Sequence, residues 1–187
     1  MILKKNLLSA LLSFGLLQAQ SSIGLDINDE DLEIIGVIDL NAFADYSDST
    51  TYLLDGYYLN TKDGNLFALG LGAENSLQGF EGLTLGFGAR FVFADNFTAL
   101  PLFGKAVYTL PLIDSIPTTS IGASFAYAPS VLTFSDGESY SEFRLEADME
   151  VIQNIHLFAG YRNLDTEYKT YDKTFNDSFY GGMKLSF

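Results

Sequence analysis

The stretch that decides the fold is residues 82–93, "GLTLGFGARFVF", in which every second position is apolar. Its odd positions read Leu, Leu, Phe, Ala, Phe and Phe, whereas its even positions read Gly, Thr, Gly, Gly, Arg and Val. A period of two residues is that of a β-strand, whose side chains alternate between the two faces of a sheet. The stretch therefore predicts a strand with one apolar face and one face of small and polar residues.

Residues 141–151, "SEFRLEADMEV", repeat the pattern with greater contrast. Apolar side chains occupy the odd positions from Phe143 to Val151, and the even positions from Glu142 to Glu150 are all charged. The Glu, Arg, Leu and Ala content would favour a helix, but helical spacing would scatter the five charges around the cylinder. The period therefore predicts a strand here as well.

Similar segments recur along the chain, with turn signals such as Lys62-Asp63-Gly64, Ala94-Asp95-Asn96, Gln153-Asn154 and "FSDGES" (134–139) between them. No helical pattern separates neighbouring strands, which predicts an antiparallel, up-and-down sheet of consecutive hairpins. Ten strands are expected, with eight as the alternative if the first segment is a plug or an arm. The predicted strands are 21–28, 32–41, 51–61, 64–74, 82–93, 98–110, 117–128, 139–151, 154–166 and 176–187.

The first nineteen residues have the features of a secretory signal peptide. Lys4 and Lys5 form a basic start, an apolar run follows from Leu7 to Leu17, and the small residue Ala19 precedes the expected cleavage point. A membrane anchor is the alternative, but a spanning helix needs about 20 apolar residues. We expect export through the Sec pathway, a signal peptide at 1–19 and one domain at 20–187.

The composition excludes several classes of protein. Cleavage would take two of the 10 Lys and Arg residues and leave all 24 Asp and Glu, a formal charge of −16, which would repel nucleic acid. The absence of Cys excludes disulfides and thiolate chemistry. The chain has 16 Phe and 11 Tyr residues, an aromatic content that a disordered acidic chain would lack.

Alternation alone does not say whether the apolar face is a soluble core or a lipid-facing surface. Segments of ten to thirteen residues are long for a sandwich but suit tilted strands that cross a bilayer. Aromatic residues gather near the ends of the apolar faces, where a bilayer has its interfacial girdles. These features favour a transmembrane β-barrel of the outer membrane over a soluble β protein.

The chain ends in "FYGGMKLSF" (179–187), which is typical of the last strand of Gram-negative outer-membrane barrels. Phe179, Gly181, Met183, Leu185 and Phe187 form one face and are predicted to be the signal that the barrel-assembly machinery recognises. With ten strands both termini lie in the periplasm, and the acidic segments near 129–138 and 167–175 lie outside.

Three stretches resemble the YfaZ family of outer-membrane proteins: "GKAVYTLP" (104–111), "HLFAGYRNL" (156–164) and the terminal "FYGGMKLSF". The first half is similar mainly in the spacing of its predicted strands and in the "KDG" turn (62–64). The resemblance implies an exported barrel whose biochemical role is unassigned, with some members described as porin-like. It implies no catalytic residue and no cofactor.

The charged residues of the polar faces are the candidate functional set. Seven acids face five permanent bases and one His, and in a narrow lumen they must pair or meet water. A salt-bridged lumen in a structural or surface-interaction barrel is the first hypothesis, a narrow porin-like channel the second and an outer-membrane enzyme the third. The predicted set is Glu33, Asp39, Asp55, Arg90, Lys105, Glu142, Arg144, Glu146, Asp148, Glu150, His156, Arg162 and Lys184.

No metal or cofactor site is predicted. His156 is the single His, and a paired lumen residue is favoured over a general base. The acidic stretch 25–33 lacks the spacing of a calcium loop and is expected to be a solvated hairpin tip. The expected partners are outer-membrane lipid and lipopolysaccharide, the assembly machinery and periplasmic chaperones. Divalent cations could bridge the loop acids to lipopolysaccharide.

Overall fold

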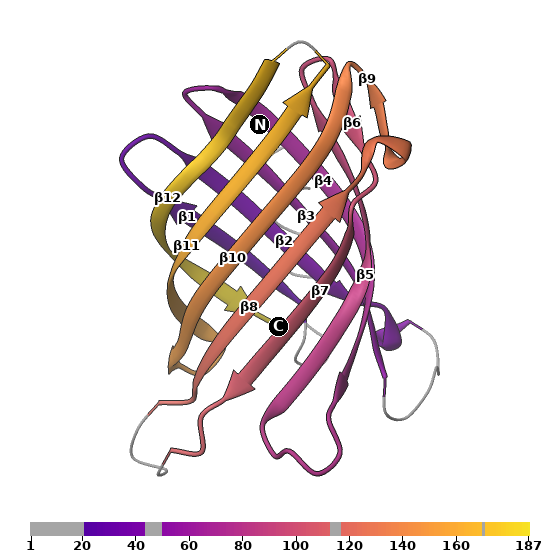
Figure 1. Cartoon of the computed structure of the whole chain (residues 1–187). Helices are drawn as coiled ribbons and strands as arrows, with labels where there is room; N and C mark the ends of the chain where they lie inside the picture. The colour runs from indigo at the N-terminus through magenta and orange to yellow at the C-terminus, as the bar shows by residue number, and fades with distance from the viewer. Residues whose placement is uncertain (1–20, 44–49, 113–116, 170) are drawn as a thin grey trace, which may run out of the picture.

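The protein is a closed antiparallel β-barrel (Figure 1). The computed structural model describes residues 21–43, 50–112, 117–169 and 171–187, so the predicted signal peptide lies outside the described residues. Each strand pairs with the next, β4 pairs with β5, and β12 pairs with β1 to close the wall. The strands of the wall are β1 (Ser22–Ile27), β2 (Leu32–Asp39), β3 (Thr51–Thr61), β4 (Gly64–Ser76), β5 (Leu83–Ala94), β7 (Leu102–Thr109), β8 (Thr119–Ala128), β10 (Gly137–Ile152), β11 (Ile155–Tyr168) and β12 (Tyr171–Ser186).

The two ends of the barrel differ. At the terminal end, the Phe187 amide donates to the Ser21 carbonyl oxygen at 2.9 Å, so the two ends of the described domain meet. At the opposite, distal end, β10, β11 and β12 rise past their neighbours (Figure 1). Since β1 covers only 181–186 of β12, residues 173–180 have no strand partner on that side within the described chain.

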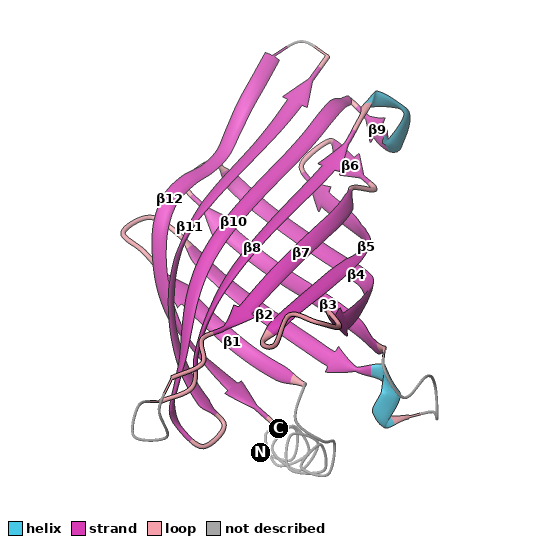
Figure 2. Ribbon diagram, turned by 60° about the horizontal axis from the view of Figure 1, so that its bottom comes forward, coloured by secondary structure: helices cyan, strands magenta, loops and turns pink. Residues whose placement is uncertain are grey.

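The ten predicted strands are confirmed, with three local differences. The last strand, expected at 176–187, is β12 and begins at Tyr171, so most of the acidic segment 167–175 is strand. The expected strand 98–110 is divided into β6 (Phe97–Ala99) and β7, because Pro101 has no N–H for the ladder between them. The predicted turn 134–139 is shorter, because β9 (Thr133–Ser135) precedes it and β10 already begins at Gly137. Two short 3₁₀ turns, η1 (Leu40–Ala42) and η2 (Ser130–Leu132), lie at opposite ends (Figure 2). No helix in the described ranges is long and apolar enough to cross a membrane.

The outer surface is an apolar belt edged by aromatic residues at the distal side. Outward-facing rings pair on this surface: Phe67 and Phe93 stack with centroids 6.3 Å apart, and Tyr161 and Phe179 pack in a tilted arrangement with centroids 5.3 Å apart. From Phe67 to the polar Asn75, β4 runs about 27 Å, which a tilt of about 40° reduces to about 20 Å of height. This is close to the apolar band of outer-membrane barrels, and the predicted apolar faces of 82–93 and 141–151 point outward on β5 and β10.

The interior is not uniformly polar, which corrects the expectation that one strand face lines a polar lumen. In the distal half, inward side chains from β3 to β12 form one apolar cluster in which Leu59, Leu66 and Leu164 are fully buried. The sequence hides this because both faces are apolar there, as in "YYL" (57–59) and "NLFALGL" (65–71). The barrel therefore has an apolar distal layer above a charged layer.

Candidate functional site in the barrel lumen

The centre of the charged layer is Glu33 on β2. Its carboxylate accepts hydrogen bonds from Arg144 at 2.8 and 2.7 Å and from Arg162 at 2.6 Å. Glu33 and Arg162 are fully buried, and the Arg162 guanidinium also lies over the Tyr180 ring. These bonds cross the bore from β2 to β10 and β11, so the charges pair as the sequence predicted.

A second group completes the layer on the other side of Arg144. Arg144 donates to Glu142, whose other oxygen accepts from the hydroxyls of Tyr57 at 2.9 Å and Tyr140 at 2.7 Å. Arg90 lies 3.5 Å from the same Glu142 oxygen and 2.7 Å from Asp55. The two tyrosines belong also to the apolar cluster, so they join the two layers.

The terminal half of the lumen is a cup of about 380 Å³. One part of its lining is apolar and includes Ile35, Val37 and Leu53. The charged side chains of the cup have partners. Lys105 pairs with Glu74 at 2.6 Å, and Lys184 and His156 each pair with Asp148 at 2.7 Å. Glu146 accepts a hydrogen bond from the Tyr180 hydroxyl at 3.1 Å. Arg144 lines this cup as well, so it links the cup to the central layer.

Two predicted lumen residues are not part of this pairing. Asp39 accepts the Asn41 amide and caps η1, and Glu150 accepts the Asn154 amide at the terminal hairpin. The remaining predicted residues lie in the layer or in the cup.

The sequence reasoning missed several lumen residues, of which Asp26 is the clearest. Alternation of Ile23, Leu25 and Ile27 on the outer face gives the signal, because it turns Asp26 inward. Asp26 is fully buried, and Arg162 Nη1 lies 3.8 Å from its Oδ2. Neither Asp26 oxygen has a hydrogen-bond partner among the described residues. The other missed residues are Glu74, Tyr57, Tyr140 and Asn176.

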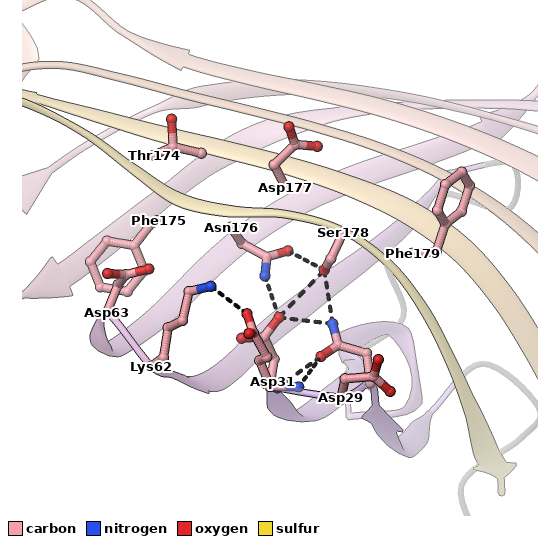
Figure 3. A pocket seen from close by; sticks show the side chains of 12 residues that line it. Asp29, Asp31, Lys62, Asp63, Thr174, Phe175, Asn176, Asp177, Ser178 and Phe179 are labelled. Atoms are coloured by element: carbon pink, nitrogen blue, oxygen red, sulfur yellow. Dashed lines mark hydrogen bonds and ion pairs between the residues drawn. The ribbon is translucent and has the colours of Figure 1, made fainter.

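A pocket of about 540 Å³ lies at the distal end, where β12 extends beyond β1 (Figure 3). The β1–β2 turn forms its floor: Asp31 accepts hydrogen bonds from Asn28 at 2.8 Å and from Asn176, and Asn28 donates to Ser178 at 2.8 Å. Lys62 donates to Glu30 at 2.5 Å, a bond that raises the pKa of Lys62. The predicted hairpin is confirmed, but its tip is residues 28–31 only. Asp26 and Glu33, which the prediction placed in the solvated tip, lie on β1 and β2 and are fully buried.

Asn176 connects this pocket to the lumen. Its side chain donates to Asp31 and accepts from Arg162 Nε at 2.9 Å. A chain of polar contacts therefore runs from the distal pocket through Arg162, Glu33 and Arg144 to the terminal cup. No group of three or more acids and histidines within the described chain is placed to hold a metal ion.

The closed sheet, the apolar outer belt and the charged lumen together define an outer-membrane β-barrel. The chain belongs to the YfaZ family, because the family model described as "YfaZ precursor" matches residues 4–187. The predicted resemblance is thereby confirmed. No curated protein matches the sequence.

Two solved structures are similar in outline. One, "KdgM porin", has 9% sequence identity and a TM-score of 0.49, and the match covers 89% of this chain and 98% of that one. The other comes from work called "Unveiling the Mechanism Behind the in-meso Crystallization of Membrane Proteins", with 10% identity, a TM-score of 0.46 and coverage of 89% and 82%.

Proposed function

We propose that the protein is a sealed outer-membrane β-barrel that does not conduct solutes and that acts through its rigid wall and its distal surface. The observation that carries this proposal is the double layer across the bore. The apolar cluster fills the distal half, and the arginine and carboxylate layer lies directly below it. Water would have to cross both layers.

A porin-like channel is the second candidate, and the terminal cup is the observation that favours it. The cup is lined by Lys105, Lys184 and Glu146, which would suit a charged passage. The cup is bounded, however, by Arg144, and an adjoining cavity of about 150 Å³ is bounded by Arg90 and Tyr57 of the charged layer. Conduction would require the bonds of Arg144 to Glu33 and Glu142 to break, and such breakage leaves buried charges that cost several kcal/mol.

Planar-bilayer recording of the purified protein tests the proposal. Insertion is verified beforehand by co-flotation with liposomes, so that electrical silence reports a closed bore. We expect no unitary steps from the wild type and increased ion leakage from a double variant, Tyr140→Ala with Arg144→Ala, which removes a large side chain from each layer. Reproducible unitary steps from the wild type would refute the sealed barrel.

We further propose that the terminal end faces the periplasm and that the C-terminal residues guide assembly. Phe179, Gly181, Met183 and Leu185 all face outward and are exposed, as a signal read by the assembly machinery requires. Periplasmic chaperones and the Sec pathway belong to the same proposal. Lipopolysaccharide and divalent cations are the proposed neighbours of the acidic turns at the distal end.

We propose no enzymatic activity. The contacts of His156 support this proposal. Its Nδ1 is paired with one oxygen of the Asp148 carboxylate, and Lys184 is paired with the other oxygen. Among the residues that the structure describes, no hydroxyl is hydrogen-bonded to His156 as a nucleophile would be. Hydrolysis of a panel of ester and peptide substrates that depended on His156 would contradict the proposal.

A further inference from the structure

Asp26 differs from the other acids of the charged layer. Its side chain is fully buried, yet neither of its carboxyl oxygens accepts a hydrogen bond from a described residue. Arg162 Nη1 lies 3.8 Å away, which is too far for a hydrogen bond, and the same nitrogen donates to Glu33 at 2.6 Å. An ionised carboxylate in this place would lack the donors that normally offset the loss of its hydration.

The charges of the layer are balanced without a charge on Asp26. Apart from Asp26, the layer contains three acids and three arginines, and each arginine is bonded to at least one of these acids. An ionised Asp26 would add a negative charge that no further cation of the layer compensates, and burial of such a charge is strongly unfavourable. The bonded pairs are Arg144 with Glu33 and Glu142, Arg162 with Glu33, and Arg90 with Asp55 and Glu142.

The side chain directly opposite Asp26 is another acid. Asp26 on β1 and Glu33 on β2 are register partners, so their Cβ atoms lie about 4.5–5.5 Å apart, and like charges at this position destabilise a sheet. Of the two Glu33 oxygens, Oε2 accepts two hydrogen bonds and Oε1 accepts one. Since a carboxylate has about four acceptor positions, Oε1 can accept one more bond. A protonated Asp26 would supply that donor and would remove the repulsion.

The remaining neighbours of Asp26 do not neutralise it. Its register partner on β12 is Gly182, where an added Cβ would lie 2.8 Å from the Asp26 Cα, so the β12 backbone leaves little room for a hydrated counter-ion. Tyr180 and Lys184, the inward neighbours of Gly182, bond to acids of the terminal cup. The arginines of β10 and β11 bond to Glu33. The surroundings thus favour the neutral form of Asp26.

We propose that Asp26 is a proton-binding site of the closing seam, whose carboxyl group is protonated at neutral pH and donates a hydrogen bond to Glu33. Asp26 lies on β1, which pairs with β12 to close the barrel. Before closure this side chain is open to water, where an Asp carboxyl is ionised above about pH 4. The barrel therefore takes up one proton from the solvent as the seam forms, whether or not its lumen conducts.

Infrared spectroscopy of the full barrel in detergent at neutral pH tests the proposal. A protonated carboxyl group has a C=O stretching band at a higher frequency than carboxylates and backbone amides. We expect this band in the wild type, and its complete loss in Asp26→Asn, which has nearly the same shape. Asp31→Asn is the matched control on the same hairpin, because buried Asp31 accepts hydrogen bonds from Asn28 and Asn176 and is expected to be ionised. Its spectrum should keep the band.

The pH dependence of stability gives a second measurement. The native state holds one proton more than the unfolded state, so stability falls as the pH rises. Between about pH 5 and pH 7, the equilibrium constant for unfolding by urea in phospholipid vesicles should rise about tenfold more per pH unit in the wild type than in Asp26→Asn.

Three results would overturn the proposal. They are the absence of the protonated-carboxyl band from the wild type, its persistence in Asp26→Asn, and an equal pH dependence of stability in the two proteins. If Asp26→Asn does not fold, ¹³C labelling of the Asp side-chain carboxyl groups in the wild type takes its place. The band should then move to lower frequency, and a band that stays in place would assign the proton to another residue type and refute the site.

Discussion

Replacing each of two facing acids by its amide should have very unequal consequences for stability. Asp26 on β1 and Glu33 on β2 are register partners, and both are fully buried in the lumen. Glu33 accepts three hydrogen bonds from Arg144 and Arg162, whereas Asp26 accepts none among the described residues. Glu33→Gln and Asp26→Asn are therefore a matched pair of nearly isosteric substitutions at one level of the barrel.

The expected magnitudes follow from what each substitution leaves behind. Glu33→Gln leaves Arg162 buried, with Asp26 at 3.8 Å as its nearest acid. Breaking a buried ion pair in this way costs about 3–5 kcal/mol. Asp26→Asn alters a buried carboxyl group that accepts no hydrogen bond from a described residue, so the free energy of unfolding should change by less than about 1 kcal/mol.

Thermal unfolding of the two variants in detergent, followed by circular dichroism, gives the measurement. At about 2–4 °C per kcal/mol for a chain of this size, Glu33→Gln should lower Tm by about 6–20 °C, and Asp26→Asn by only a few degrees. Guanidinium titration of the same samples checks that the order of stability holds. Equal losses for the two variants, or a larger loss for Asp26→Asn, would refute the assignment of the charged layer.

Two further changes test the wall and its assembly. Gly182→Ala should destabilise the barrel by about 2 kcal/mol or more, because the added Cβ would lie 2.2 Å from a β1 carbonyl oxygen, whereas Gly104→Ala should be nearly neutral in the same unfolding assay. Deletion of Phe187 should lower the amount of heat-modifiable barrel in outer-membrane fractions, and unchanged levels would contradict its role in assembly.

Much of the wall could be predicted because lipid contact enforces a strict period. In β10 the apolar face from Phe143 to Val151 and the charged face from Glu142 to Glu150 both follow the sequence pattern. The pairing of lumen charges was also predictable, since buried charges require partners. Which charge pairs with which was not, because Glu33 and Arg162 are 129 positions apart in the chain.

The distal half could not be predicted by the same rule. Beyond the lipid belt, the wall no longer separates an apolar outside from a polar inside. Whether a side chain there packs against others or contacts water depends on its neighbours in space, which the sequence period does not reveal. A register shift between β11 and β12 illustrates this, because Leu164 pairs with Asn176 and Asp165 with Thr174. The skipped residue, Phe175, is buried in the apolar cluster, although alternation from Asn176 would turn it outward.

The position of the charged layer is explained by where the wall is shortest. The closing seam between β1 and β12 has six register pairs, whereas the neighbouring β11–β12 pair has fourteen. The hydrogen bonds from Arg144 on β10 and Arg162 on β11 to Glu33 on β2 bridge this seam from the inside. Asn176 and Asp31 tie its distal end, just where β1 stops and the pocket begins. The lumen ion pairs thus hold the two sides of the seam together, as ladder hydrogen bonds do along the longer strand pairs. This stabilisation is a reason for the barrel to retain buried ion pairs although their desolvation is costly.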